Sequence, residues 1–427
     1  MGQGDRETTR RMRSRYSRRQ RNRKLRVSRG LHRILRFILG SYLKAQFNLQ
    51  SRHQEVLSRI RPPYLVLCNH TSVWDPFFLN SKLDAPIHYV VSDSQFRSRF
   101  VAFGLGLVGS IPKTKVLADL ETVKSIVKIK HDRGIIGVFP EGQTSWDGHT
   151  LPLIPSTAKL IKSLKVPVVI ARIEGAYFSR PRWSRLPRRG KVTVDFSLAF
   201  TPEQLRGMSS EEIYTAITDL LRYDAYEQQD QEMTRFVGRR LAEYLERAIF
   251  VCPDCEKVGT LHSHRRRLRC LHCGYEVHYN PFGYFEKRHG TLRFETIRAW
   301  NLWQVGVFQD QLDRWLAEPS PRQPFMRESG AKLEIGYKTL PLKELTTGEM
   351  VLTEEGIRIG APEASFTFPI FAVEGMNIQN NERMEFYFRD ELYKVTLLDP
   401  RGCTYKWDVA TKYLQNNPLM SHVPPRG

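Results

Sequence analysis

The chain has 427 residues and a formal charge of +21, with 66 Lys and Arg against 45 Asp and Glu. This length is enough for two or three domains. No apolar stretch approaches the ~18 to 20 residues that cross a bilayer, and the charge indicates an anionic partner, either nucleic acid or an acidic membrane surface.

Residues 1–30 form a basic arm, which carries twelve Lys or Arg against Asp5 and Glu7, a net charge of +10. Few apolar residues anchor this segment, so we expect it to be disordered. The arm is also too long for the basic part of a secretory signal, and no cleavable apolar core follows it.

The next segment has the pattern of an amphipathic helix. Charged residues surround a set of apolar residues at helical spacing, which are Leu31, Ile34, Leu35, Ile38, Tyr42 and Leu43. This pattern predicts a helix that lies in a membrane interface, so residues 1–48 are interpreted as a basic arm followed by an interfacial helix. The alternative is that residues 31–47 pack on the main domain as its first helix.

A histidine and an aspartate follow the first predicted strand, Tyr64–Cys68. His70 is a candidate general base, and Asp75 could orient it by accepting a hydrogen bond from the other ring nitrogen. Residues five apart do not share a helix face, so the pair should span a turn that leads into a helix. Such a pair can form a base and its orienting carboxylate without a serine nucleophile, so the nucleophile would be a substrate hydroxyl.

Strands and helices alternate through the rest of this region. Apolar runs predict further strands at Ile135–Phe139 and Val166–Ile173, and helical spacing predicts helices at Leu117–Lys130 and Ser156–Leu164. This alternation indicates an α/β sheet with chemistry at the carboxyl ends of its strands.

Four ordered blocks carry a specific resemblance. They read Asn69-His70-Thr71-Ser72-x-x-Asp75-Pro76, Gly109-Ser110-Ile111-Pro112-Lys113-Thr114-Lys115, Phe139-Pro140-Glu141-Gly142-x-x-Ser145 and Val166-Pro167-Val168-Val169. Together they resemble the glycerolipid acyltransferases, in particular the 1-acylglycerol-3-phosphate acyltransferase family.

The resemblance implies an enzyme in which a histidine deprotonates a glycerol hydroxyl, which attacks the thioester of acyl-CoA or acyl-carrier protein. His70 would be the base and Asp75 its partner. The second and third blocks would bind the acceptor phosphate and position its glycerol, and these places fall on Lys115 and on Glu141, Gly142 and Ser145.

Two departures indicate a changed acceptor head group or compensation by other cations. Lys115 and Thr144 stand where the family usually has arginine, which can hold phosphate with two parallel donors. The candidates for compensation are Lys113, Arg180, Arg182, Arg185, Arg188, Arg189 and Lys191. The basic run 180–191, which includes Trp183, is either an interfacial loop or an ordinary solvated loop.

The acyltransferase domain is predicted to span residues 49–248. Val192–Phe196 is expected as a late strand, and a helical region opens at Thr201 and runs, with interruptions, to Phe250.

A cysteine module follows at residues 249–284. Cys252, Cys255, Cys270 and Cys273 form two C-x-x-C pairs with fourteen residues between them, a pattern typical of one structural Zn²⁺ site. The segment resembles a zinc ribbon; a mixed ligand set with a nearby histidine is the alternative. The arginines between the two pairs could bind nucleic acid, a carrier protein or lipid phosphate.

Residues 285–427 are predicted to be a helix followed by a β-rich domain. A helix is expected at Thr291–Leu316, short strands at Met384–Phe388 and Leu392–Leu397, and a final helix at Asp408–Gln415. Strand spacing followed by a helix suggests a pleckstrin-like barrel over residues 330–427.

The sequence therefore predicts a mixed α/β sheet flanked by helices, a small four-cysteine zinc ribbon and a C-terminal α+β or β-rich domain. The predicted protein is a peripheral membrane acyltransferase on the cytoplasmic face, which transfers a fatty acyl group to a lysophospholipid, with 1-acylglycerol 3-phosphate favoured. An acyl-carrier protein is a possible partner, and nucleic acid is disfavoured. The alternative is a nucleic-acid-binding zinc-ribbon protein with a degenerate lipid-binding core.

Overall fold

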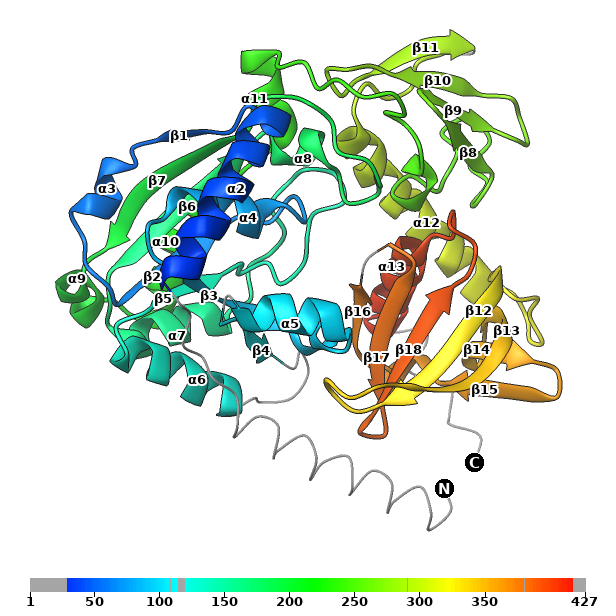
Figure 1. Cartoon of the computed structure of the whole chain (residues 1–427). Helices are drawn as coiled ribbons and strands as arrows, with labels where there is room; N and C mark the ends of the chain where they lie inside the picture. The colour runs from blue at the N-terminus through cyan, green and yellow to red at the C-terminus, as the bar shows by residue number, and fades with distance from the viewer. Residues whose placement is uncertain (1–28, 108, 114–119, 290, 380, 418–427) are drawn as a thin grey trace.

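The computed structural model describes residues 29–107, 109–113, 120–289, 291–379 and 381–417. These residues form three sheets: a seven-stranded mixed sheet, a four-stranded antiparallel sheet and a seven-stranded antiparallel sheet. Figure 1 shows the first sheet with helices around it, and the other two sheets beside it. The predicted architecture is confirmed, while residues 1–28 of the expected basic arm lie outside the described residues.

The first sheet has the strand order β1-β7-β6-β2-β5-β3-β4. Its strands are β1 (Gln50–Arg52), β2 (Tyr64–Cys68), β3 (Ile87–Ser92), β4 (Ile111–Lys113), β5 (Ile135–Val138), β6 (Val168–Glu174) and β7 (Thr193–Phe200). Central β2 runs parallel to β5 and β6, whereas β7 is antiparallel to β6. All five residues of β2 are buried, as expected for a parallel strand covered on both faces.

Successive residues of β2 contribute to two cores because side chains alternate across a strand. Tyr64, Val66 and Cys68 pack in one core with the helices α2 (Arg29–Phe47) and α4 (Asp75–Lys82). Leu65 and Leu67 pack in the other core. The helices of that second face are α6 (Leu120–His131), α7 (Ser156–Leu164) and α10 (Ser210–Leu221).

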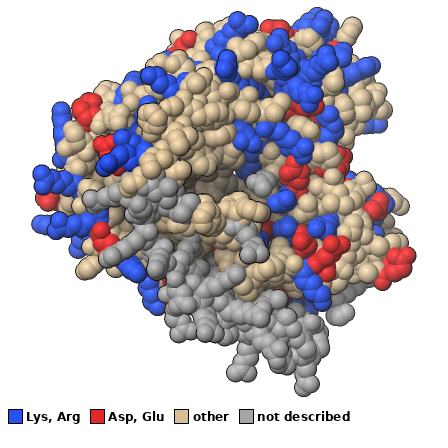
Figure 2. Space-filling model, in the orientation of Figure 1, with Lys and Arg blue, Asp and Glu red and all other residues tan. Residues whose placement is uncertain are grey.

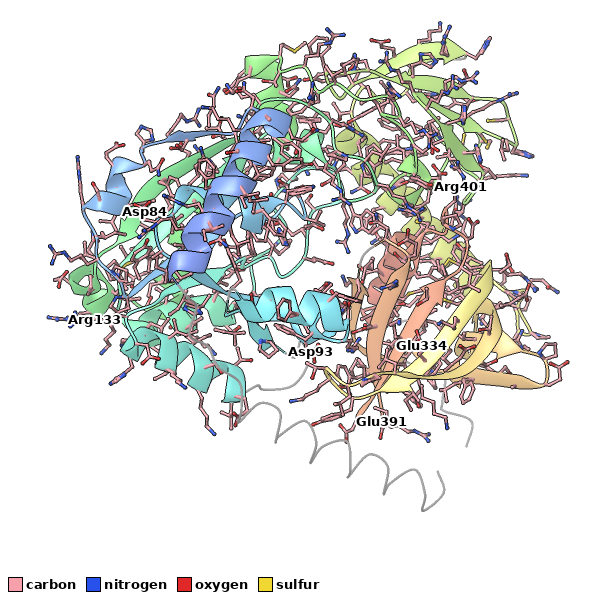
Figure 3. The ribbon with its side chains drawn as sticks, in the orientation of Figure 1. Asp84, Asp93, Arg133, Glu334, Glu391 and Arg401 are labelled. Atoms are coloured by element: carbon pink, nitrogen blue, oxygen red, sulfur yellow. The ribbon has the colours of Figure 1, made fainter. Side chains whose placement is uncertain are left out.

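Helix α2 has a buried face and an exposed apolar face. Leu43 and Phe47 are fully buried, and Arg36 forms an ion pair with Asp84, a residue that Figure 3 labels. On the other side, Phe37 is 77% exposed and Ile38 is 62% exposed. The helix therefore packs on the main domain, as the alternative interpretation expected, and still presents an apolar surface. No described helix combines the length and apolar content needed to cross a membrane.

The prediction of helix up to Phe250 is wrong beyond residue 232. The helices of this region are α9 (Pro202–Gly207), α10 and α11 (Ala225–Glu232), and α11 ends at Met233, which has a left-handed φ of 44°. Most of the segment after it is irregular, with one 3₁₀ turn at Leu245–Arg247. Its backbone bonds to other segments instead, because Val237 and Arg189 exchange hydrogen bonds of 2.6 and 2.9 Å.

The small sheet follows with strand order β11-β10-β9-β8. Its antiparallel strands are β8 (Leu261–His264), β9 (Arg267–Cys270), β10 (Glu276–Tyr279) and β11 (Phe285–His289). Helix α12 (Ile297–Ala317) comes next and starts later than predicted, because the Thr296 side chain caps it by accepting from the amide of Ala299 at 3.0 Å.

The C-terminal sheet has the strand order β15-β14-β13-β12-β18-β17-β16 and is followed by α13 (Thr404–Gln415). Its strands are β12 (Met326–Gly336), β13 (Lys343–Thr353), β14 (Gly356–Ala361), β15 (Ala364–Phe368), β16 (Glu374–Gln379), β17 (Arg383–Phe388) and β18 (Glu391–Leu397). The predicted strands near residues 384–397 and the final helix are confirmed. Because β15 and β16 are the two ends of the described sheet, a pleckstrin-like barrel stays a prediction.

Arg97 joins the C-terminal sheet to the first domain. Its Nε donates to the carbonyl of Lys338 at 2.6 Å, and its guanidinium pairs with Glu385. Helix α5 (Arg99–Leu107) begins two residues later, close to this junction in Figure 1. The C-terminal sheet is therefore attached beside the carboxyl end of β3.

Candidate active site

His70 and Asp75 lie between the end of β2 and the start of α4. His70 Nδ1 is 2.9 Å from Asp75 Oδ2. Asp75 is the first residue of α4 and is followed by Pro76, which is favoured at the first turn of a helix. The prediction that the pair spans a strand-to-helix turn is confirmed.

The carboxylate of Asp75 is fully buried and faces three donors. Besides His70, the backbone amides of Thr71 and Ser72 donate to the same Oδ2, each at 2.8 Å. Burial raises the pKa of Asp75, and these hydrogen bonds oppose the rise. Among the described residues, Oδ1 has no hydrogen-bond partner. The buried carboxylate is thus directed at the histidine.

The imidazole of His70 is held from one side by an aromatic stack. Its ring centroid lies 4.3 Å from that of Phe139, at an interplanar angle of 28°, and Phe139 stacks in turn on Tyr89. The His70 side chain is 19% exposed. With Nδ1 directed to Asp75, Nε2 is the ring nitrogen that can take a proton from a ligand.

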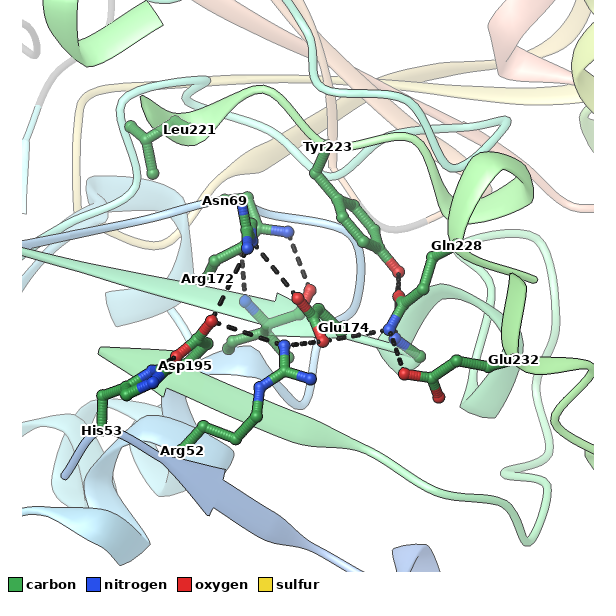
Figure 4. Close-up of polar contacts among 12 residues, drawn as sticks. Arg52, His53, Asn69, Arg172, Glu174, Asp195, Leu221, Tyr223, Gln228 and Glu232 are labelled. Carbon is green, nitrogen blue, oxygen red and sulfur yellow. Dashed lines mark hydrogen bonds and ion pairs between the residues drawn. The ribbon is translucent and has the colours of Figure 1, made fainter. Parts of the chain in front are cut away.

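Asn69 ties this turn to the neighbouring strand β6. Its side chain accepts from the amide of Ile173 at 2.7 Å and donates to the carbonyl of the same residue at 2.9 Å. The next residue, Glu174, accepts from Arg52 Nη2 at 2.5 Å and from Gln228 at 3.0 Å (Figure 4). A polar network at the carboxyl end of β6 therefore holds the turn that carries His70.

Glu141, in the loop after β5, connects the third block to the first. Its Oε1 accepts from the backbone amide of His70 at 2.7 Å, and its Oε2 accepts from the amide of Leu151 at 2.8 Å. Burial raises the pKa of Glu141 to about 8. Both oxygens are directed at backbone amides, which differs from the substrate contact expected for this residue.

Ser145 has a similar backbone role. Its amide donates to the carbonyl of His70 at 3.0 Å. Its hydroxyl donates to Asp147 Oδ1 at 3.1 Å and accepts from the amide of Gly148 at 3.0 Å. Ser145 is fully buried, so its contacts also differ from the expected substrate contact.

Gly142 forms the sharp turn of the same loop. It has a φ of +71°, which glycine adopts without steric cost. A Cβ at this position would lie 2.8 Å from Ile154 Cδ1. The structure therefore explains why this turn requires glycine.

Arg182 fixes the carbonyl of Thr144. Its guanidinium donates to the Thr144 oxygen at 2.7 Å and to the Ile378 oxygen at 3.0 Å, and it lies 4.3 Å over the Trp146 ring. Burial lowers the pKa of Arg182 to about 10. This side chain connects the third block to β16 of the C-terminal sheet.

The interfacial role predicted for Trp183 in residues 180–191 is wrong. Trp183 is fully buried, and Arg188 is buried and donates to the carbonyls of Phe178 and Leu241. The guanidinium groups of Arg182 and Arg188 donate to backbone carbonyls inside the protein. These two residues are therefore not available to bind an acceptor phosphate in place of the missing arginines.

Of the two cations of the second block, the structure describes Lys113. Lys113 ends β4 and is opposite Ser92 in β3. Lys115 lies outside the described residues. Arg180 is half-buried, and its backbone oxygen accepts from the Ser72 hydroxyl at 3.1 Å. Burial lowers the pKa of Arg180, while Tyr42 raises it.

Sequence reasoning missed Asp147 and Asn301. Asn301 Nδ2 of α12 donates to Asp147 Oδ2 at 2.9 Å, and Arg298 Nη1 lies 3.6 Å from the same oxygen. The Asn301 side chain also accepts from Gln304 Nε2, and Gln304 Oε1 accepts from the backbone amides of residues 250 and 251. This chain of contacts links the third block to the segment that enters the cysteine module. Asp147 directly follows that block, but nothing in the sequence pairs it with a residue 154 positions away.

The four cysteines come together as predicted and could hold a metal ion. Their Sγ atoms all lie within 4.8 Å of one another. Cys252 and Cys273 are 3.6 Å apart, and Cys255 and Cys270 are 3.7 Å apart. A tetrahedral Zn²⁺ with Zn–S bonds of ~2.3 Å requires a sulfur separation of about 3.8 Å, so the thiols fit this ion and no disulfide is present among them.

The segment that contains this site is similar to known proteins. The family model Acyltransferase matches residues 48–174, which include the His70–Asp75 pair and the Glu141 loop. The 1-acyl-sn-glycerol-3-phosphate acyltransferase of Bacillus subtilis (strain 168) is 22% identical over 160 residues, which cover 37% of this chain and 77% of that protein.

One solved structure gives a partial overlap. The crystal structure of the 1-acyl-sn-glycerophosphate (LPA) acyltransferase PlsC from Thermotoga maritima aligns with a TM-score of 0.36 and 20% identity, over 40% of this chain and 68% of that one.

Proposed function

We propose that the chain is an acyltransferase of the glycerolipid type, which transfers a fatty acyl group from a thioester donor to the free hydroxyl of a lysophospholipid. The match of residues 48–174 to the family model Acyltransferase and the similarity to a 1-acyl-sn-glycerol-3-phosphate acyltransferase support this proposal. The favoured acceptor is 1-acylglycerol 3-phosphate, and the donor is acyl-CoA or acyl-carrier protein. The distance of 2.9 Å between His70 Nδ1 and Asp75 Oδ2 is the observation that carries this proposal.

In the proposed reaction, Nε2 of His70 takes the proton of the acceptor hydroxyl as its oxygen attacks the thioester carbonyl. A C–O bond forms and the C–S bond breaks, which gives an ester and a thiolate. The imidazolium then returns its proton to the thiolate sulfur. Asp75 stabilises the imidazolium between these steps and holds the tautomer that has its proton on Nδ1.

Two residues of the third block support this reaction by positioning His70. Glu141 accepts from the backbone amide of His70, and Ser145 donates to its backbone carbonyl, so together they fix the position of the base. We assign the acceptor phosphate to three cations, which are Lys113 at the end of β4, Arg180 after β6, and Lys115 of the second block. Arg180 belongs here because its backbone already contacts Ser72 of the first block.

Apolar side chains around the site support a peripheral membrane position. Val73 and Phe77, which flank the His70 turn, are 46% and 45% exposed, and Phe100 and Phe103 of α5 are 91% and 70% exposed. The outer face of α2 is also apolar, and Figure 2 shows an area with few charged residues in the region of α2. A lipid substrate could then reach His70 from an anionic, cytoplasmic-facing leaflet.

The four thiolates would hold a structural Zn²⁺, which supplies folding energy and no chemistry because a four-cysteine site has no open position. The ribbon would then act as a rigid joint. It lies between α11 and α12 in sequence, and its residues share a core with Trp146 beside the third block.

The test is to incubate the purified full-length chain with labelled acyl-CoA and lysophosphatidic acid and to separate the lipid products. We expect wild type to form phosphatidic acid and His70→Ala to lose at least roughly 10²-fold in rate. His131→Ala is the matched control, because this histidine is 90% exposed at the end of α6. No transfer to any lysolipid from either donor type, or full activity of His70→Ala, would refute the proposal.

A further inference from the structure

The outer face of the four-stranded sheet carries a hollow lined by arginine. The hollow has a volume of about 300 Å³, and its lining includes Arg239, Arg265, Arg266, Arg267, Arg288 and His278. Figure 2 shows Lys and Arg gathered at this end of the molecule, where Figure 1 places β8–β11. The function proposed above makes no use of these residues.

These arginines differ from others in the chain because they lack acidic partners. Arg97, Arg298 and Arg401 pair with Glu385, Asp224 and Glu246, respectively. By contrast, none of the five arginines lining the hollow forms an ion pair with a carboxylate within the described part of the chain. All five side chains are exposed, so an incoming anion would meet guanidinium groups that are not already neutralised.

The register of the sheet places cationic and imidazole side chains in one row. His264 is opposite Arg267, and Arg267 is opposite His278 on the next strand. Arg288 Nε donates to His278 Nε2 at 3.0 Å. His278 accepts this hydrogen bond through an unprotonated nitrogen, so its imidazole is neutral, and the residue opposite it on β11 is Glu286. Arg267 and Arg288 are therefore two guanidinium groups beside a neutral imidazole.

The tip of the β8–β9 hairpin adds two arginines in a fixed conformation. Arg265 has a left-handed φ of 54° at a position where Asn or Gly is the usual residue. Its amide donates to Glu243 Oε2 at 3.1 Å, and its carbonyl accepts from Ala242 at 2.8 Å. The tip is thereby held against the segment that supplies Arg239.

A second hollow adjoins the first and shares Arg266 and His278 with it. It has a volume of about 420 Å³ and adds Arg235. Glu286 also lines this hollow, and its Oε1 accepts from Asn280 at 2.9 Å. Volumes of this size suit a small ligand rather than a flat surface.

We propose that the two hollows form a binding site for a phosphate-bearing small ligand on the outer face of the cysteine module. Planar guanidinium groups bind phosphate oxygens with paired donors, and three separate segments of the chain bring such groups to one place. Two sources share this chemistry: a soluble nucleotide-like ligand such as CoA, and the phosphomonoester head group of a lipid such as phosphatidic acid. Binding here is independent of acyl transfer at His70.

The test measures binding of inorganic pyrophosphate and CoA to the full-length, zinc-loaded chain by titration calorimetry at several salt concentrations. The Arg267→Gln/Arg288→Gln double variant removes the guanidinium group opposite His278 and the one that donates to it. The matched control is Arg206→Gln/Arg358→Gln, which removes the same charge from exposed positions on α9 and β14. Zinc content and circular dichroism establish that each variant is folded.

We expect wild type and the control to bind alike, with affinity falling as salt rises, and the Arg267/Arg288 variant to bind at least roughly tenfold more weakly. Flotation with vesicles of phosphatidic acid or phosphatidylglycerol distinguishes the sources. A loss confined to phosphatidic acid vesicles would identify the lipid head group, whereas a loss confined to CoA would identify the soluble ligand. Absence of binding by wild type, equal binding by a folded double variant, or binding only to RNA or DNA oligonucleotides would overturn the proposal.

Discussion

The carboxylate of Glu141 accepts the backbone amide of His70 at 2.7 Å, so the loop after β5 determines where the catalytic turn after β2 lies. The two residues follow the adjacent parallel strands β2 and β5, whose carboxyl ends meet at the same edge. Ser145 adds the reciprocal contact by donating its amide to the His70 carbonyl. Residues of the third block therefore hold both backbone polar groups of a single residue of the first block, His70.

Asp75→Asn should abolish most of the activity while leaving the fold intact. The amide oxygen can still accept from Thr71 and Ser72, and its NH₂ group would occupy the place of Oδ1, which has no partner among the described residues. What is lost is the negative charge that stabilises the imidazolium. We expect kcat to fall by roughly 10³- to 10⁴-fold with KM little changed. A kcat close to that of wild type in steady-state assays would rule out the orienting role.

The buried carboxyl of Glu141 should make stability decrease as pH rises. In the unfolded chain this group ionises near 4.5, whereas burial raises its pKa to about 8 in the folded protein. Between these values the folded state keeps a proton that the unfolded state has released, so the free energy of unfolding falls with increasing pH. The contribution is complete below the unfolded pKa and is lost as pH rises through the folded pKa.

Urea unfolding of wild type and Glu141→Gln at about pH 5 and about pH 8 checks this expectation. The stability of the variant should change less between the two pH values, because its neutral amide has no proton to release. An equal pH dependence in both proteins would show that Glu141 is not the group responsible.

Loss of one cluster thiolate should unfold the cysteine module. Structural zinc contributes ~10 to 16 kcal/mol of apparent free energy in small sites, so Cys270→Ser should lower zinc content from one ion per chain and reduce the melting temperature. Cys403→Ser is the control: it changes a buried cysteine that donates to the Arg247 carbonyl, a contact that serine can keep. A Cys270→Ser protein with full zinc and unchanged melting would contradict the assignment.

Membrane binding should depend on the exposed face of α2 and not on the whole helix. Deleting α2 would also remove the buried Leu43 and Phe47, so point changes are the sharper test. Phe37→Ser combined with Ile38→Ser should reduce flotation with anionic vesicles by at least roughly tenfold, because each inserted apolar side chain contributes ~1.5 to 3 kcal/mol. Leu302→Ser, at a 62% exposed position on α12, should have no effect. Unchanged flotation of the α2 variant would remove this surface from consideration.

The parts of the site that are close in sequence could be predicted, and those that depend on distant contacts could not. The spacing of His70 and Asp75 after an apolar run was enough to place both at a strand-to-helix turn. The roles of Glu141 and Ser145 were harder to infer, because the same side chains can contact a substrate or a neighbouring backbone, and only packing decides between them.

The helical pattern after residue 232 failed for a related reason. Backbone groups near Val237 pair with Arg189 and with the ribbon, and these tertiary hydrogen bonds outweigh local helical preference. Likewise, the charge of residues 180–191 suggested a surface loop, yet Arg182 and Arg188 find carbonyl acceptors up to 196 residues away. Residue type alone does not reveal such acceptors.

The double contact of Arg182 couples two parts of the protein that no single motif connects. Its guanidinium donates to a carbonyl of the Glu141 loop and to a carbonyl of β16. If the C-terminal sheet moved away, this buried cation would lose one of its hydrogen-bond acceptors. Shortening the chain to its acyltransferase segment would therefore remove the Ile378 acceptor of Arg182, and with it one support of the loop that positions His70. Swapping the C-terminal sheet between homologous enzymes would succeed only if the replacement offered an acceptor at the same point.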